Sequence, residues 1–271
     1  MESFSVLLSL YYKENSNFLR QALDSIFSQT VKSDDVVLVE DGMLTDELEA
    51  TVKEYEHKFP ELHVVRFEKN RGLGHALNDG LKHCKHELVA RADTDDVCKP
   101  WRFERQLALF AQHPDYDLCS SWIDEFITDI DHVTSIRKLP EGPDENYRYG
   151  MKRCPVNHPA VMYKKSAVEA VGGYQTKYFP EDYFLWVKML MNGCKFYNIQ
   201  DSLVWFRYDP DTYKRRGGWK YAHDEAITQL NIHKLGYTSL AVMIENIIIR
   251  SCVRLIPNEL RGLVYKKFLR K

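Results

Sequence analysis

The sequence lacks any apolar run long enough to cross a membrane. A span needs roughly 18 consecutive uncharged apolar residues, and no window offers them. The nearest candidate, residues 238–257, is interrupted by Glu245, Arg250 and Arg254. The N-terminus also lacks the basic region and apolar run of a signal peptide. These absences predict a protein of the cytoplasm.

The chain has little net charge and no cysteine pairs. The formal charge is −2 at pH 7, so there is no global basic field, and we expect no nucleic-acid partner. Six scattered cysteines form no C-x-x-C pair, which indicates reduced core residues. The length of 271 residues, with 44% hydrophobic and 28% charged residues, is typical of a soluble protein with one large α/β domain or two small ones.

The first hundred residues alternate between strand-like and helix-like patterns. Short apolar runs are followed by stretches with apolar residues at helical spacing, and Thr45 and Pro100 are placed to begin helices. Such alternation predicts an α/β fold with a mainly parallel sheet and helices on both faces. The expected strands are 4–10, 36–39, 62–67 and 87–92, and the expected helices 15–29, 46–57, 72–83 and 100–112.

The second half of the chain is less regular. The expected strands are 118–122, 160–163, 195–199 and 203–208, with a hairpin over 125–139 and a helix over 181–191. A basic, glycine-rich stretch (KRRGG) and C-terminal helices follow. We therefore expect one domain over 1–210, with a nucleotide-binding half (1–115) and an acceptor or catalytic half (116–210). Residues 211–271 would form a basic loop and a helical segment.

Polar residues follow each of the first four expected strands. Ser9, Asp41 and Arg71 stand after the first three, and an acidic run stands after the fourth. Ligands of open α/β sheets bind at the carboxyl ends of the strands, so this pattern predicts a polar ligand site. Asp41 suits a hydrogen bond from a nucleobase or a turn before Gly42. Arg71 suits a diphosphate, a base or a simple surface position.

The acidic run Asp93-Thr94-Asp95-Asp96 is the strongest single signal. Its carboxylates repel one another unless they are solvated or bound to a cation. Alternating carboxylates on a turn suit a hard divalent ion such as Mg²⁺ or Mn²⁺, which completes its shell with substrate phosphates. The alternative is a solvated acidic turn that caps the following helix.

Three further sets of candidates lie in the second half. Glu181 and Asp182 open an apolar helix, whose dipole would keep a general base ionised, although acids are also ordinary at helix starts. His158 is either a ligand contact between the two halves or a loop histidine. Arg215 and Arg216 suit donor phosphate oxygens or a basic surface loop.

Taken together, the motifs resemble those of the family 2 glycosyltransferases, which have the GT-A fold. The resemblance covers about residues 3–208, and the order and spacing of the motifs are similar to those of the family. Within the family, the chain looks most like bacterial enzymes of capsular or O-antigen polysaccharide synthesis. The motifs are VLLSLYYKEN, SIFSQT, VVLVEDG, NRGLGHALNDGL, RADTDD, NHPAVMYKKSAVEAVGGY and PEDYFLWVKML.

The resemblance implies a role for each matching residue. Ser9 and Asp41 would contact a uracil or thymine nucleoside, and Arg71 would lie over the base or the phosphates. Asp93 would touch the ribose or the metal, and Asp95 would be the main metal ligand. The implied general base is Asp182. The chain departs from the family pattern at residues 11–13, where Tyr-Tyr-Lys replaces an aromatic-Asn pair.

The implied enzyme is an inverting, metal-dependent transferase. It would move a hexose from a nucleotide-diphosphate sugar, such as a UDP-sugar, to a saccharide carried on a polyprenyl diphosphate lipid. A sugar-phosphate nucleotidyltransferase is one alternative, but it would need a glycine-rich loop after the first strand, and residues 9–16 contain no glycine. The other alternative, a noncatalytic membrane-surface module, leaves RADTDD and PEDYF unexplained.

The C-terminal segment has its own pattern. Apolar residues recur there at near-helical spacing, and a mostly basic sequence follows. This predicts an interfacial helix on the cytoplasmic membrane face, and the alternatives are packing on the protein's own core or a homodimer seam. The apolar residues are Leu240, Met243, Ile244, Ile247, Ile248 and Val253, and the basic ones Arg250, Arg254, Arg261, Lys266, Lys267, Arg270 and Lys271.

Overall fold

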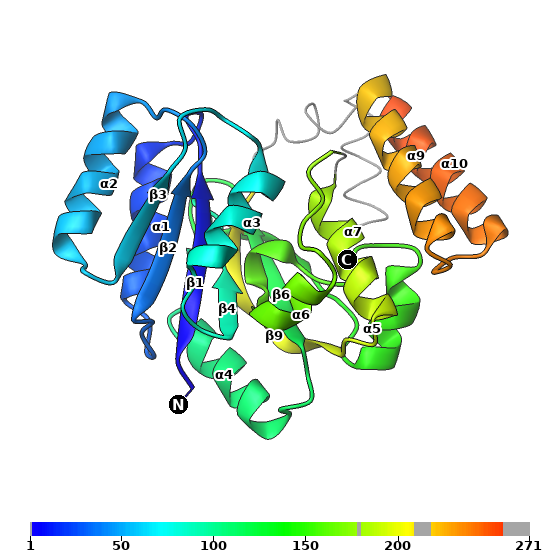
Figure 1. The fold of residues 1–271 in the computed structure, drawn as a ribbon, viewed down its shortest axis with the longest axis horizontal. Helices are drawn as coiled ribbons and strands as arrows, with labels where there is room; N and C mark the ends of the chain where they lie inside the picture. The colour runs from blue at the N-terminus through cyan, green and yellow to red at the C-terminus, as the bar shows by residue number, and fades with distance from the viewer. Residues whose placement is uncertain (1, 178–179, 209–217, 257–271) are drawn as a thin grey trace.

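The fold is a single sheet with helices on both faces. The computed structural model describes residues 2–177, 180–208 and 218–256. Its sheet has the strand order β3-β2-β1-β4-β8-β6-β9-β5, with β7 paired to β6 (Figure 1). This arrangement confirms the expected α/β class. No helix within the described ranges is long and apolar enough to cross a membrane.

The first half has the predicted alternation. Strands β1 to β4 are mutually parallel in the order β3-β2-β1-β4. Thr45 caps α2 as expected, because its hydroxyl accepts a bond from the Leu48 amide at 3.4 Å. The elements are β1 Phe4–Leu10, α1 Ser16–Phe27, β2 Asp35–Glu40, α2 Asp46–Lys58, β3 Leu62–Arg66, α3 Leu73–His83, β4 Leu88–Arg91, β5 Val97–Cys98 and α4 Arg102–Gln112.

The second half makes the sheet mixed. β8 runs antiparallel to both β4 and β6, whereas β6 and β9 are parallel. The two strands expected over 195–208 are one strand, β9, which stays paired with β6 through register shifts opposite Trp122. The short helices α5 and α6 were not predicted. The elements are β6 Leu118–Phe126, β7 Val133–Arg137, α5 Pro143–Gly150, a 3₁₀ turn His158–Ala160, β8 Met162–Lys164, α6 Lys165–Ala170, α7 Glu181–Met191, β9 Phe196–Arg207, α9 Trp219–Lys234 and α10 Leu240–Leu255.

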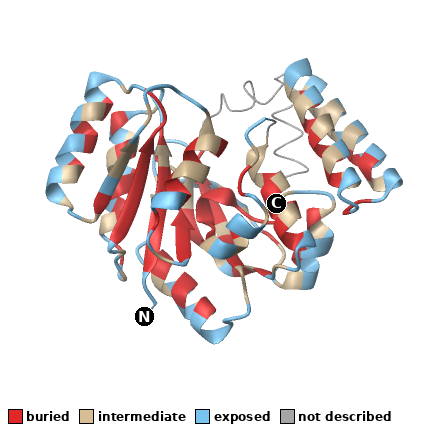
Figure 2. Cartoon of the chain, in the orientation of Figure 1, coloured by how far each residue is buried: buried red, intermediate tan, exposed pale blue. Residues whose placement is uncertain are grey.

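Alternating side chains of the strands build two cores. Val6 and Leu8 of β1 point to the face covered by α1, α2 and α4, and Leu7 points to the face covered by α3 and α7. Figure 2 shows the buried strands between helices whose outer surfaces are exposed. α3 packs closely, because a Cβ on Gly80 would lie 2.5 Å from Leu7 Cδ1 and 2.6 Å from Val39 Cγ2.

α9 and α10 form a hairpin at the end of the molecule opposite α2 (Figure 1). A buried carboxylate joins them: Glu225 Oε1 accepts from Arg250 Nη1 at 2.5 Å, and Oε2 accepts from Arg254 Nε at 2.9 Å. Burial alone would raise the pKa of Glu225, but the two arginines hold it below its usual value. Arg250 and Arg254 therefore face the protein, which corrects the expectation that they face a membrane.

We expect Glu225→Gln to destabilise the fold, because it leaves two partly buried guanidinium groups without their counter-charge. Breaking a buried pair typically costs about 3 kcal/mol or more. Chemical denaturation measures the loss. Glu245→Gln is the matched control, since its exposed pair with Lys152 should contribute no more than about 1 kcal/mol. Equal losses in both variants would contradict a stabilising role of the buried pair.

Candidate active site

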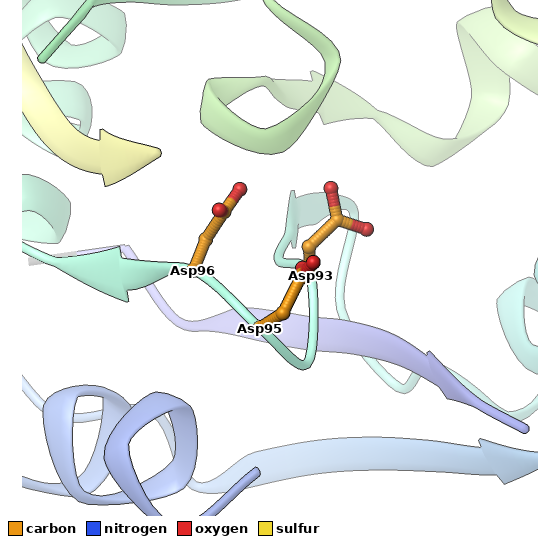
Figure 3. A group of neighbouring side chains, drawn as sticks. All are labelled: Asp93, Asp95 and Asp96. Carbon is orange, nitrogen blue, oxygen red and sulfur yellow. The ribbon is translucent and has the colours of Figure 1, made fainter. Parts of the chain in front are cut away.

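Three carboxylates converge in the turn between β4 and β5. Oxygen atoms of Asp93, Asp95 and Asp96 all lie within 4.8 Å of one another. Figure 3 shows their side chains rising from the turn on the same side. The turn follows the carboxyl end of a parallel strand, which is where the sequence predicted a ligand site.

The carboxylates are not fully compensated by the protein. Arg91, itself buried, makes a paired contact with both oxygens of Asp93. Asp96 Oδ1 accepts from the Arg207 amide at 2.8 Å, but Asp96 Oδ2 is buried without a partner among the described residues. Burial, followed by the charges of neighbouring carboxylates, raises the pKa values of Asp95 and Asp96. Such a cluster has an excess of negative charge in a poorly hydrated place.

These residues fit a divalent cation. Carboxylate oxygens are the ligands that Mg²⁺ and Mn²⁺ prefer, and a cation would remove the repulsion among them. The unpartnered oxygen of Asp96 could be a further ligand, and the spacing in the sequence left the choice among Asp93, Asp95 and Asp96 open. Because Arg91 already donates to both oxygens of Asp93, the carboxylate oxygens of Asp95 and Asp96 are more available to a cation.

Arg207, at the end of β9, supports the acidic turn from the other half of the chain. Its Nε donates to the Asp95 carbonyl at 2.9 Å, its amide donates to Asp96, and its Nη2 contacts Gln21. The guanidinium carbon also lies 3.9 Å from the ring centroid of Phe18. Sequence reasoning missed this residue. Its only signal was a lone arginine at the end of an otherwise apolar strand.

Asp41 is buried and organises the turn before α3. Its Oδ1 accepts from the Arg71 amide at 2.7 Å, and its Oδ2 accepts from the Gly72 amide at 2.9 Å. The neighbouring Gly42 has φ +93°, and a Cβ there would lie 2.6 Å from the Asn70 amide nitrogen. The turn is therefore tightly defined. The contact of Asp41 with a nucleobase remains a prediction.

Ser9 and Arg71 lie at the same carboxyl rim of the sheet. Ser9 is half-buried in β1, and the Thr94 hydroxyl of the acidic turn lies 3.5 Å from its carbonyl oxygen. Arg71 is about half exposed, donates to Asp79 at 2.8 Å and lies over the Phe67 ring. Their contacts with a nucleotide stay predictions.

His158 is buried and is not a loop histidine. Its Nε2 lies 3.1 Å from the Tyr174 hydroxyl, and its ring meets Trp186 edge-on at 5.7 Å between centroids. Burial, followed by the positive charge of Arg91, lowers its pKa well below the usual value, which keeps the imidazole neutral. Its expected ligand contact stays a prediction.

Asp182 stands in the first turn of α7. Its Oδ1 accepts from the Tyr183 amide at 2.7 Å, and its Oδ2 lies 3.9 Å from Cys154 Sγ. Burial, then the charge of Asp182, raises the pKa of the adjacent Glu181 to about 7, and Arg91 and Asp93 also act on Glu181. The charges of Arg91 and Asp93 therefore reach the start of α7. Arg215 and Arg216 lie outside the described residues.

The fold and this acidic rim define an α/β protein with a polar ligand site at the carboxyl ends of its strands. Glycosyl transferase family 2 matches residues 5–172, and the chain belongs to this family. It is 42% identical over 268 residues to the Escherichia coli UDP-Gal:alpha-D-GlcNAc-diphosphoundecaprenol beta-1,3-galactosyltransferase, covering 99% of this chain and 97% of that protein. It is 36% identical over 266 residues to the amylovoran biosynthesis glycosyltransferase AmsE of Erwinia amylovora, covering 97% and 98%.

Solved structures share the GT-A fold. S. aureus TarS 1-349 in complex with UDP-GlcNAc has a TM-score of 0.67 at 18% identity, covering 93% of this chain and 72% of that one. The Pyrobaculum calidifontis mannosyltransferase PcManGT, in complex with GDP-Man and Mn²⁺, has a TM-score of 0.60 at 18% identity, covering 98% and 81%. The chain is therefore a glycosyltransferase with a GT-A architecture, as the resemblance in sequence motifs implied.

We expect Asp96→Asn to stabilise the metal-free protein near neutral pH, because it removes the buried member of three carboxylates that repel one another. A gain of about 1 kcal/mol would raise Tm by about 2–4 °C in a chain of this size. The same change should reduce the rise in Tm that Mn²⁺ produces. Thermal unfolding with and without Mn²⁺ tests both. Asp115→Asn, at an exposed surface pair, is the control. A lower metal-free Tm together with an unchanged Mn²⁺ response would contradict the cation assignment.

Proposed function

We propose that this glycosyltransferase moves a hexose, with inversion, from a UDP-sugar to a saccharide on a polyprenyl diphosphate lipid in surface-polysaccharide synthesis. The observation that carries the proposal is the acidic turn after β4, with the first turn of α7 nearby. The acidic turn would hold the donor, and the first turn of α7 would supply the general base. Because the reaction releases a nucleoside diphosphate, product analysis distinguishes it from nucleotidyl transfer, which releases pyrophosphate.

The residues proposed to hold a divalent cation are Asp95 and Asp93, with Asp96 beside them. When bound, such an ion neutralises charge that develops on the departing diphosphate. Arg91 fixes the Asp93 carboxylate, and Arg207 fixes the backbone of the turn. Both arginines orient the carboxylates before the donor arrives, so less ordering remains to be done on binding.

Asp182 is the proposed general base. The positive end of the α7 dipole favours its ionised form, and the bond from the Tyr183 amide orients one of its oxygens. The other oxygen would accept the proton of the acceptor hydroxyl, which attacks the anomeric carbon from the face opposite the leaving group. A single displacement of this kind inverts the anomeric configuration.

The proposed substrates come from the relatives. The E. coli protein, aligned along nearly the whole chain, is named for UDP-Gal and a GlcNAc-diphosphoundecaprenol acceptor, and the Erwinia protein for amylovoran synthesis. We propose the same substrate classes here, with the enzyme working peripherally on the cytoplasmic face of the membrane. A panel of UDP-sugars, assayed for release of UDP in the presence of a lipid-linked GlcNAc acceptor, tests the assignment.

We expect Asp95→Ala to abolish the Mn²⁺-dependent part of UDP binding, because it removes a carboxylate that would hold the cation. Calorimetry of UDP with and without Mn²⁺ measures the effect. The exposed Asp115→Ala provides a control of the same chemistry away from the rim. Unchanged Mn²⁺-dependent affinity in a folded Asp95 variant would exclude Asp95 as a ligand.

We expect Asp182→Asn to reduce kcat by about 10²–10⁴, the usual cost of losing a general base. UDP binding should be nearly unchanged, because Asp182 acts on the acceptor. Turnover and calorimetry on the same preparation separate the two effects. Near-normal turnover would reject Asp182 and leave Glu181 as the next residue to test.

A further inference from the structure

One face of α10 carries apolar side chains into solvent. We call the outward residues the outer stripe, and they recur at three- and four-residue intervals along the whole helix. Ile244 is 46% exposed and Ile248 57% exposed, although both are large apolar side chains. A helix on the surface of a globular protein normally turns such residues inward. The outer stripe is Leu240, Ala241, Ile244, Ile248, Cys252 and Leu255.

The opposite face of α10 holds the polar groups. Asn246 is buried and donates to the Met151 carbonyl and to Gln229 Oε1, both at 2.9 Å. Arg250 and Arg254 bind the buried Glu225, and Arg250 also donates to the Lys152 carbonyl at 2.7 Å. These specific contacts fix the rotation of the helix. The exposure of the outer stripe is therefore built into the hairpin.

Almost no free charge interrupts the outer stripe. The acid next to it, Glu245, is partly neutralised by Lys152, whose Nζ lies 3.0 Å from Glu245 Oε1. In sequence, the stripe is followed directly by 257–271, where five basic residues (Arg261, Lys266, Lys267, Arg270 and Lys271) stand against one acid, Glu259. An apolar strip next to basic sequence suits an anionic lipid surface.

We propose that the outer stripe inserts into the headgroup and acyl boundary of an anionic phospholipid bilayer. The occupant follows from the proposed function, on which this inference rests, since a polyprenyl-linked acceptor keeps its sugar at such a surface. The outer stripe supplies the apolar part of the attraction, and the paired Arg250 and Arg254 contribute none of the electrostatic part. Binding through the stripe should therefore persist at high salt, unlike attachment by surface charge.

Ile248→Asp is the variant that tests the stripe. Removing one large apolar side chain from the lipid, at about 1.5–3 kcal/mol for full burial, should weaken vesicle binding about tenfold or more. The control is Val133→Asp on β7, which makes the same kind of change at a similarly exposed apolar residue, 43% exposed, away from α10. Co-sedimentation with vesicles of phosphatidylcholine and phosphatidylglycerol, in low and in 1 M salt, measures binding without any sugar substrate.

The proposal predicts that the full chain and Val133→Asp retain binding in high salt, and that Ile248→Asp loses it with an unchanged Tm. UDP release with a soluble acceptor analogue should be equal in all three proteins. If the substrate proposal is wrong, that assay fails while the vesicle result still stands. Binding that vanishes in high salt for the full chain, or that is equal in Ile248→Asp, overturns the proposal. A full-chain dimer that becomes monomeric in Ile248→Asp, without vesicle binding, assigns the stripe to a second copy and also overturns it.

Discussion

Repulsion among the carboxylates at the end of β4 is the constraint around which the site is built. Few hydrogen-bond donors lie close to the carboxylates of Asp93, Asp95 and Asp96. Burial makes a charge on them costly. Two arginines from different parts of the chain limit that cost. Arg91 pairs with Asp93, and Arg207 holds the backbone of the turn. The remaining negative charge is what the proposed divalent cation would neutralise, so a locally unfavourable arrangement would prepare the site for that ion.

The sheet explains how these groups meet. The parallel half brings Ser9, Asp41 and the acidic turn to one rim, because all its strands end on the same side. β8 then reverses direction beside β4, and β9 delivers Arg207 to the same rim from more than a hundred residues away. The mixed half of the sheet is thus the means by which the second half of the chain contributes to the rim formed by the first.

The C-terminal hairpin of α9 and α10 places its charged and apolar side chains differently from the rest of the molecule. Its charged groups are used internally, on Glu225 and along the α5–α7 side, and its apolar groups are left outside. For a protein that completes its function in water this distribution is unfavourable. For the proposed enzyme with a lipid-linked acceptor, it would place a membrane-binding surface on the same molecule as the active site.

The sequence by itself determined the first half of the fold, the family and the acidic turn. These features leave local signals in the sequence: period-two and helical patterns, the Thr45 cap and the order of the motifs. Such signals can be interpreted without knowing the tertiary structure. Only tertiary structure decided the rest. The two strands expected within 195–208 are one, because β9 stays paired with β6 on both sides of the register shifts at Trp122. His158 is buried because Tyr174 and Trp186, from later elements, close over it. The contacts of Arg207 and the rotation of α10 depend on partners far away in sequence. No local pattern encodes which face of a strand or helix such partners will contact.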